Sequence, residues 1–296
     1  MKPFNYVLAG NISDAISWAH NYSGSYLAGG TDILMGIKSG QVQPTVLVDL
    51  KGISGLKGIN TDHRGIHIGA LTTVREMETS PVLKEKVPML AMAASRLGSV
   101  QVRNRATIGG NLCNAAPSAE LAPALLCLEA TVEITGLNGL REVALEQFFT
   151  GPRRTVIQPG EIVTGILFPQ PKASAGGVYY KLSVRKAMDI AFVGVAVLLE
   201  VYDEIIVKAR IGLGAVAPVP MRARAAEEVL NGSELTAARV KEAAAAAAAA
   251  CQPISDLRSS AEYRRDMVRN YVARGVEEAF RLANPVAKGM NYEQEN

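Results

Sequence analysis

The sequence predicts an α+β protein of two domains, and three observations support this prediction. The chain has 296 residues with 48% hydrophobic and 20% charged composition, enough to bury more than one core of ordinary size. Short strand-like segments mix with helical ones and do not alternate as a regular βαβ series. Residues 169–177, PQPKASAGG, are rich in element-breaking residues and are expected to link the two domains.

The first domain, residues 1–170, is expected to consist of two subdomains that meet near residue 57. In the smaller subdomain, strand-like runs at residues 25–28 and 45–50 lie on either side of a helical segment. This arrangement predicts a small βαβ-like unit whose first strand ends at a glycine pair. Ser13 is a candidate N-cap for an earlier helix.

The larger subdomain, residues 58–170, mixes strands with helices. Apolar runs rich in β-branched residues predict three strands, at residues 65–71, 131–135 and 162–168. Thr73 and Glu76 have the spacing of a capping box and predict that a helix begins there.

The second domain, residues 177–284, begins with strands and ends with helices, and residues 285–296 form a tail. Three antiparallel strands are predicted, at residues 177–184, 190–202 and 205–211. Helices are predicted at residues 222–230, 237–251 and 261–282. The apolar residues expected on or near one face of the last helix are Tyr263, Met267, Tyr271, Val276 and Phe280.

Composition argues against nucleic-acid and membrane partners. The formal net charge is only +3, and the 31 basic residues are scattered among 28 acidic ones. No stretch approaches about 18 uninterrupted apolar residues, so no membrane span is expected. The N-terminus lacks the apolar core of a signal peptide, and the expected location is the cytoplasm.

The sequence offers no metal site and no catalytic residue. Its three cysteines, Cys113, Cys127 and Cys251, show no CxxC spacing, which excludes a four-thiolate metal or cluster site in this chain. His63 and His67 are four residues apart, but the intervening run is strand-like, so their side chains do not converge as on a helix. Both are interpreted as surface histidines.

Three familiar nucleotide-binding patterns fail, two in their spacing and one in the residues that follow it. Residues 36–39 resemble the end of a P-loop, but Ile37 separates the glycine from the lysine. Gly52, Gly55 and Gly58 are spaced three apart, which does not match GxGxxG. Residues 212–217 do match GxGxxA after a strand, but the prolines that follow at positions 218 and 220 oppose the helix that a dinucleotide-binding turn requires.

Two glycine pairs have a better context for a phosphate. Gly29-Gly30 ends a predicted strand and is followed by Thr31 and Asp32 at the start of a predicted helix. Glycine allows the backbone to approach a phosphate closely and to turn successive N–H groups toward it. Thr31 adds a hydroxyl, and Asp32 adds an acidic group that could cap the helix.

The second pair, Gly109-Gly110, lies between Thr107 and Asn111 in a segment with many small and polar residues. Its backbone must find hydrogen-bond partners outside a sheet. Two such loops, each offering N–H groups and hydroxyls, suit a doubly charged pyrophosphate better than one. The sequence therefore predicts a dinucleotide site between the two glycine pairs.

At these residues the chain resembles the FAD-binding medium subunit of the molybdenum hydroxylases, the family of xanthine dehydrogenase and carbon monoxide dehydrogenase. The resemblance covers nearly the whole chain. Its motifs are AGGTD at residues 28–32, RNxATIGGN at 103–111, the segment 117–123, GEIV at 160–163, Lys181 with Arg185 and DIA at 189–191, and GAVAPxPxR at 214–222.

The resemblance implies a two-part FAD-binding region of the vanillyl-alcohol-oxidase (PCMH) type, followed by a smaller α/β C-terminal domain. It implies that FAD is bound by Leu27, Ala28, Gly29, Gly30, Thr31, Asp32, Ile33, Leu97, Thr107, Gly109, Gly110, Asn111, Glu120, Ile162, Val163 and Lys181. Glu120 stands where relatives usually carry aspartate, and would bond a cofactor hydroxyl. Leu97 matches a position that is aromatic in some relatives. Lys181 matches a lysine near the pyrimidine side of the flavin, where a cation would raise the flavin potential.

By the same resemblance, the chain passes electrons through FAD from [2Fe-2S] clusters of a small partner subunit to NAD⁺ or another acceptor. A large molybdopterin subunit would hydroxylate the substrate. Two alternatives remain open at this point: a self-contained flavin oxidase or reductase of the same superfamily, and a non-catalytic dinucleotide-binding protein. The first would need its own substrate pocket and general base, and the sequence identifies neither.

Overall fold

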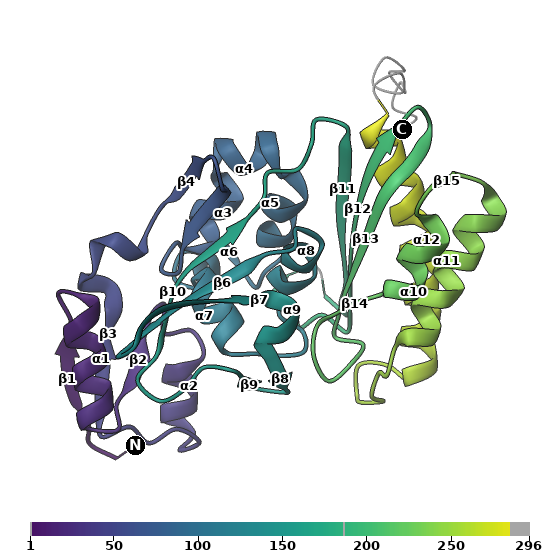
Figure 1. Cartoon of the computed structure of the whole chain (residues 1–296). Coiled ribbons are helices and arrows are strands. Elements are labelled where there is room, and N and C mark those ends of the chain that lie inside the picture. The colour runs from purple at the N-terminus through teal and green to yellow at the C-terminus, as the bar shows by residue number, and fades with distance from the viewer. Residues whose placement is uncertain (1, 186, 285–296) are drawn as a thin grey trace.

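The computed structural model describes residues 2–185 and 187–284, so the tail predicted at residues 285–296 lies outside the described residues. Three larger sheets follow one another along the chain, from the N-terminal part to the C-terminal helices (Figure 1). Strands and helices mix as an α+β protein, which confirms the predicted fold class.

The N-terminal sheet has three parallel strands in the order β1-β3-β2. Its elements are β1 (Asn5–Leu8), α1 (Ile12–Asn21), β2 (Ser25–Leu27), α2 (Ile33–Lys38), β3 (Val46–Asp49) and two short 3₁₀ turns, η1 (Leu50–Gly52) and η2 (Ser54–Leu56). The βαβ unit β2-α2-β3 confirms the prediction. The predicted N-cap Ser13 is wrong, because Asn11 caps α1 by accepting a hydrogen bond from the Asp14 N–H.

The middle sheet has five antiparallel strands in the order β4-β5-β10-β6-β7. These are β4 (Ile59–Asp62), β5 (Gly65–Gly69), β6 (Thr131–Gly136), β7 (Gly139–Ala144) and β10 (Ile162–Phe168). The three inner strands were predicted. The two outer ones were missed, because their largely polar, exposed residues show no apolar pattern.

One apolar core joins this sheet to the helices of the same region. These helices are α3 (Val74–Thr79), α4 (Pro81–Lys86), α5 (Pro88–Ser95), α6 (Val100–Arg103), α7 (Ile108–Cys113), α8 (Leu121–Cys127) and α9 (Leu145–Phe148), followed by a small hairpin of β8 (Phe149–Gly151) and β9 (Arg154–Thr155). The predicted capping box is present: Thr73 and Glu76 cap the start of α3 reciprocally.

The C-terminal sheet runs in the order β11-β12-β13-β14, with β15 also paired to β13, and all its pairs are antiparallel. Its strands are β11 (Ala175–Leu182), β12 (Val193–Tyr202), β13 (Ile205–Gly214), β14 (Met221–Arg222) and β15 (Ser233–Glu234). The helices are α10 (Arg224–Leu230), α11 (Ala237–Ala250) and α12 (Ala261–Ala283). The sheet stands between α5 and α8 on one side and these three helices on the other (Figure 1).

The buried face of α12 agrees with the predicted one only in part. Val276 is fully buried, as predicted, but Tyr263 is 46% exposed, and the other inward positions include Arg264, Val268 and Val272. Small and β-branched residues line this face because α12 lies close against β11 and β12. Met267, Tyr271 and Phe280 pack at its margin, as the large side chains do not fit under the helix.

The GxGxxA segment after β13 is a packing feature. A Cβ on Gly212 would lie 2.2 Å from the Pro123 carbonyl oxygen, and a Cβ on Gly214 would lie 2.9 Å from Pro123 Cγ. The two glycines therefore let β13 press against α8. No helix follows them until α10, which confirms that this is not a dinucleotide-binding turn.

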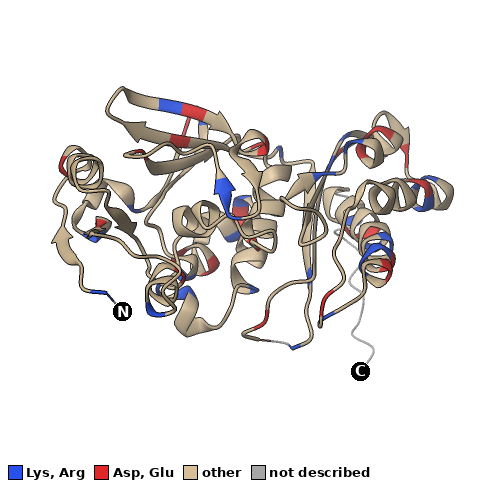
Figure 2. Ribbon diagram, turned by 90° about the horizontal axis from the view of Figure 1, so that it is seen from below, with Lys and Arg blue, Asp and Glu red and all other residues tan. Residues whose placement is uncertain are grey.

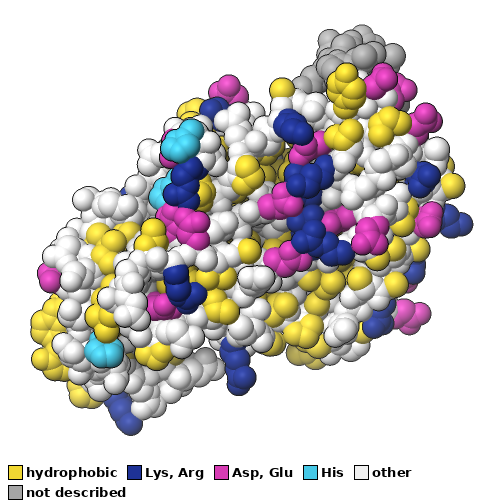
Figure 3. All heavy atoms as spheres, in the orientation of Figure 1, with side chains coloured by type: hydrophobic (Ala, Val, Ile, Leu, Met, Phe, Trp, Pro, Cys, Tyr) yellow, Lys and Arg dark blue, Asp and Glu magenta, His cyan; other side chains and the backbone are white. Residues whose placement is uncertain are grey.

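Charges are dispersed over the described residues. Lysine and arginine alternate with aspartate and glutamate along the ribbon (Figure 2). Basic and acidic side chains interleave in one band on the face shown in Figure 3. In the C-terminal sheet, Glu200 pairs with Lys172 at 3.0 Å and with Arg210 at 2.6 Å. None of the described helices combines the length and apolarity needed to cross a membrane.

Replacement of Gly212 by alanine tests the contact between β13 and α8. The added Cβ would clash with a backbone oxygen, so we expect Gly212→Ala to lower the unfolding free energy by about 1–3 kcal/mol. Thermal unfolding followed by circular dichroism measures the change. Gly55→Ala is the control, since nothing lies within 4 Å of its Cβ position. Equal melting temperatures for the two variants would refute the proposed packing contact.

Candidate cofactor site

The two glycine-pair segments lie against each other. A Cβ on Gly29 would be 1.9 Å from the Arg105 carbonyl oxygen, and a Cβ on Gly110 would be 4.0 Å from the Ala28 Cβ. Only a residue without a side chain allows this approach of two backbones. The close contact joins the N-terminal subdomain to the segment before α7, so the predicted neighbours in the site are neighbours in space.

The first segment, residues 28–32, connects β2 to α2. Gly30 has a φ of +83°, which turns the chain between the two elements. Within the described part of the chain, the N–H groups of Gly29, Gly30, Thr31 and Asp32 donate no hydrogen bond to a protein acceptor. They are therefore available to an anion.

Asp32 does not cap α2 with its side chain, so the expectation of an acidic cap is wrong. Its carboxylate instead accepts hydrogen bonds from Thr31 Oγ1 at 3.3 Å and from Asn114 Nδ2 at 3.0 Å. Asn114 in turn accepts from Arg153 Nη1 at 3.1 Å. This chain of polar contacts provides a second link between the two segments.

The second segment is not a loop. Gly109 and Gly110 belong to α7, whose N-cap is Thr107. The N–H of Gly109 donates to the Ala70 carbonyl at 2.9 Å, and that of Gly110 donates to Thr107 Oγ1 at 3.1 Å. The expectation that this pair offers free N–H groups is therefore wrong, because the fold already uses them.

Asn111 is the residue of this segment with unused hydrogen-bonding capacity. Its Oδ1 is buried and accepts no hydrogen bond from any described residue. Such an atom is costly in a folded protein unless a ligand satisfies it. Asn111 therefore points to a bound group with a hydroxyl or N–H donor.

Five of the predicted residues turn their side chains into the protein. Leu27 belongs to a small core against which Ile33 packs. Ile162 lies in the N-terminal core, against which Ala28 packs, and Val163 lies in the main core. These side chains hold the surrounding segments in place, and their roles in binding stay predictions.

Glu120 and Lys181 form a buried ion pair at the start of α8 and the end of β11. Lys181 Nζ lies 2.8 Å from Glu120 Oε1, and the two side chains are 6% and 12% exposed, lysine first. The ammonium also donates to the Asp189 carbonyl at 2.7 Å and to the Arg96 carbonyl at 3.0 Å. All three of its hydrogens therefore have protein acceptors.

Burial and two neighbouring charges shift the pKa of Glu120 in this pair. Burial raises the pKa of Glu120 above its ordinary value, and the nearby ammonium of Lys181 opposes this shift. The negative charge of Asp32 adds a smaller upward contribution to the pKa. Asp32 and Glu120 therefore share one electrostatic environment, which connects the glycine segments to the ion pair.

Leu97 directly follows Arg96, whose carbonyl accepts a hydrogen bond from Lys181 Nζ. Its side chain is 6% exposed and belongs to the main core. Its carbonyl accepts a hydrogen bond from Arg103 Nη1 at 3.0 Å. The sequence had not indicated roles for Arg103 or Asn114, although both lie within the polar run around the second glycine pair.

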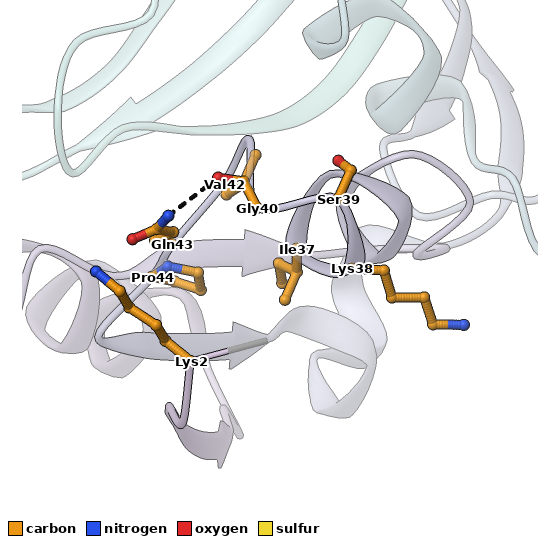
Figure 4. Close-up of a pocket in the computed structure, with 8 residues that line it drawn as sticks. All are labelled: Lys2, Ile37, Lys38, Ser39, Gly40, Val42, Gln43 and Pro44. Atoms are coloured by element: carbon orange, nitrogen blue, oxygen red, sulfur yellow. Dashed lines mark hydrogen bonds between the residues drawn. The ribbon is translucent and has the colours of Figure 1, made fainter.

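A cavity near α2 does not resemble a cofactor site, and the described residues hold no metal-binding cluster. A cavity of about 240 Å³ lies at the end of α2, but Lys38 points away from it and Gln43 is bonded to the Gly40 carbonyl (Figure 4). Across residues 2–185 and 187–284, no three His, Cys, Asp or Glu side chains are grouped closely enough to hold a metal ion.

Comparison with known families gives two matches that together span most of the chain. A model described as the FAD binding domain in molybdopterin dehydrogenase matches residues 2–171. A model of the CO dehydrogenase flavoprotein C-terminal domain matches residues 178–279.

Individual relatives agree with these matches. The chain is 36% identical to the carbon monoxide dehydrogenase medium chain of Afipia carboxidovorans, over 93% of this chain and 96% of that protein. It is 33% identical to the nicotinate dehydrogenase FAD-subunit of Eubacterium barkeri, over 80% and 82% of the respective chains. A chain in the structure of carbon monoxide dehydrogenase from Hydrogenophaga pseudoflava superposes with a TM-score of 0.91 at 33% identity, covering 95% of this chain and 99% of that one.

These relatives confirm the resemblance that the glycine pairs and their flanking motifs indicated. The chain belongs to the FAD-binding medium subunits of the molybdenum hydroxylase family: it is an oxidoreductase subunit whose cofactor is FAD.

Proposed function

We propose that this chain takes electrons from [2Fe-2S] clusters of a small partner subunit and hands them, through FAD, to NAD⁺ or another acceptor. A large partner subunit with a molybdopterin cofactor would carry out the substrate hydroxylation, and we place this complex in the cytoplasm. The observation that carries the proposal is the contact between the two glycine segments beside the Glu120–Lys181 pair.

Three features of the site fit FAD: two suit its pyrophosphate, and one suits its hydroxyl groups. The Arg105 carbonyl fills the position where a Gly29 side chain would stand and so holds the two segments together, and the N–H groups of Gly29 and Gly30 have no protein acceptor within the described residues. Thr31 and Thr107 contribute hydroxyls nearby. The buried Asn111 Oδ1 needs a donor, and the hydroxyls of a dinucleotide would supply one.

FAD, when bound, supplies a ring that takes up two electrons and releases them again. Lys181 would influence this ring through its charge, because its three hydrogens already have protein acceptors. A buried positive charge favours the more negative, reduced state and so raises the potential. The carboxylate of Glu120 partly cancels that charge, and its second oxygen can accept from a cofactor hydroxyl.

Purification of the native assembly tests the proposal as a whole. We expect the chain to copurify with an iron–sulfur subunit and a molybdopterin subunit, and to show flavin absorbance that bleaches with NADH if NAD⁺ is the acceptor. Purification of the chain as a homomer without partners would reject the proposed complex. A colourless chain that takes up no added FAD would contradict the assigned site.

Gly29→Ala tests the contact between the glycine segments. Its Cβ would clash with the Arg105 carbonyl oxygen and push the two segments apart, so we expect FAD affinity to fall at least about tenfold, or about 1.4 kcal/mol. Quenching of flavin fluorescence on titration measures the Kd. Gly55→Ala is the matched control and should bind FAD normally. Unchanged affinity in Gly29→Ala would show that FAD does not need this contact.

Asn111→Leu separates binding from stability. The substitution removes a buried oxygen without a partner, so the FAD-free chain should melt at the same temperature or slightly higher. FAD affinity should fall nonetheless, by about 1–3 kcal/mol, because a hydrogen bond to the cofactor is lost. Thermal melts with and without FAD measure both effects. A lower melting temperature together with normal FAD affinity would assign Asn111 a purely structural role.

Changes at Lys181 and Glu120 should move the flavin potential in opposite directions. Lys181→Met removes the positive charge and should lower the potential, whereas Glu120→Gln removes the opposing negative charge and should raise it. We expect shifts of at least about 30 mV, which is about 1.4 kcal/mol for a two-electron couple. Reduction with a reference dye measures the potential. Lys84→Met, at an exposed position of α4, is the charge control. Shifts of the same sign in the two site variants would disprove the charge model.

A further inference from the structure

The turn at residues 96–98, between α5 and α6, is held by all three of its carbonyl groups. The Arg96 carbonyl accepts from Lys181 Nζ at 3.0 Å, and the Leu97 carbonyl accepts from Arg103 Nη1 at 3.0 Å. The Gly98 carbonyl accepts from the Met188 N–H at 3.1 Å. Three consecutive residues are thus bound by three different elements: β11, α6 and the segment that follows β11.

Arg103 is the buried donor of this group. It lies at the end of α6, only 8% exposed, and its guanidinium spans two partners. Nη1 bonds the Leu97 carbonyl, while Nε and Nη2 bond the two carboxylate oxygens of Glu78 at 2.8 and 3.2 Å. A planar guanidinium held by two bonds to one carboxylate keeps a defined orientation.

Glu78 anchors this arrangement from α3. Burial by itself would raise the pKa of the Glu78 carboxyl, but hydrogen bonds from Arg103 and Arg75 bring it below its ordinary value. Glu78 is therefore a charged, fixed partner at neutral pH. Arg75 contacts the same carboxylate at 2.9 Å but is 43% exposed and reaches no carbonyl of the turn.

We propose that Arg103 is a positioning residue for the flavin site: by holding the turn at residues 96–98, it sets the place of the Lys181 ammonium relative to the cofactor. This inference rests on the proposed function of Lys181. Arg103 itself need not touch FAD. The same turn carries Leu97, so a shift of the turn would displace both of these predicted flavin neighbours together.

The turn at residues 96–98 packs tightly, so a change at Arg103 should also displace Leu97 and the Lys181 ammonium. Gly98 has a φ of +50°, and a Cβ there would lie 3.0 Å from Val102 Cγ1, so the turn fits tightly against α6. Without Arg103, the Leu97 carbonyl would lose the one side-chain donor that it has among the described residues. The turn would then move to regain a partner, because unsatisfied buried carbonyls are costly.

The test compares Arg103→Met with Arg75→Met in the full-length chain. Each substitution removes one cationic partner of Glu78, but only the first frees the turn. We expect the Kd for FAD to rise about tenfold in Arg103→Met and to stay within about twofold of wild type in Arg75→Met. The flavin potential of Arg103→Met should shift in the same direction as that of Lys181→Met.

A double-mutant cycle decides whether Arg103 acts through Lys181. In the Lys181→Met background, the substitution of Arg103 should leave the potential unchanged. An equal shift in both backgrounds would overturn the inference, as would matching FAD affinity and potential in Arg103→Met and Arg75→Met. If wild type itself binds no FAD, the proposed function fails first, so the two failures are distinguishable.

Glu78→Gln provides a second route if Arg103→Met does not fold. The amide keeps the shape of the anchor but removes its charge, so the guanidinium is held less firmly while its bond to Leu97 is retained. We expect a smaller shift of the potential in the same direction as in Arg103→Met. A melting temperature that falls while the potential stays at the wild-type value would show a purely structural role for the pair.

Discussion

The close approach of backbones at glycine is the constraint on which this molecule depends. At Gly29, the N-terminal subdomain touches the carbonyl of Arg105, and at Gly212 the C-terminal sheet touches the carbonyl of Pro123. Neither contact tolerates a side chain. The first brings together the two segments of the cofactor site, and the second sets the C-terminal sheet against the helix that carries Glu120 at its start.

The second contact matters for the site because Lys181 comes from the C-terminal sheet. Its ammonium reaches across to Glu120 and to the Arg96 carbonyl, both in the middle region. Two parts of the chain that are also joined by the main core therefore share one buried charge pair. A buried ion pair does little for stability by itself, but it specifies where the two parts meet.

The division of labour between FAD and the protein fits a redox subunit. The cofactor supplies the reactive group, and the chain supplies binding, orientation and electrostatics. Within the described residues, the N–H groups at residues 29–32 have no protein acceptor, and in the proposed function the charges of Lys181 and Glu120 adjust the potential.

Local pattern was enough to predict much of the fold. The local sequence pattern predicted the inner strands of the middle sheet and the long strands β12 and β13. It also predicted the capping box at Thr73. The outer strands β4 and β7 were missed because pairing with β5 and β6 holds them in the sheet, and their own residues show no apolar pattern. The inward face of α12 was predicted only in part, at Val276, because the sheet beneath the helix decides which side chains are buried.

For the site, the sequence by itself determined which segments carry glycine, hydroxyl and charge, and the family resemblance determined FAD. Only the tertiary structure decided how these groups are used. It showed that the N–H groups of Gly109 and Gly110 donate to protein acceptors, whereas those of residues 29–32 have no acceptor among the described residues. It also showed that Lys181 is paired, because hydrogen bonds between residues about 60 to 85 positions apart depend on packing that no local pattern encodes.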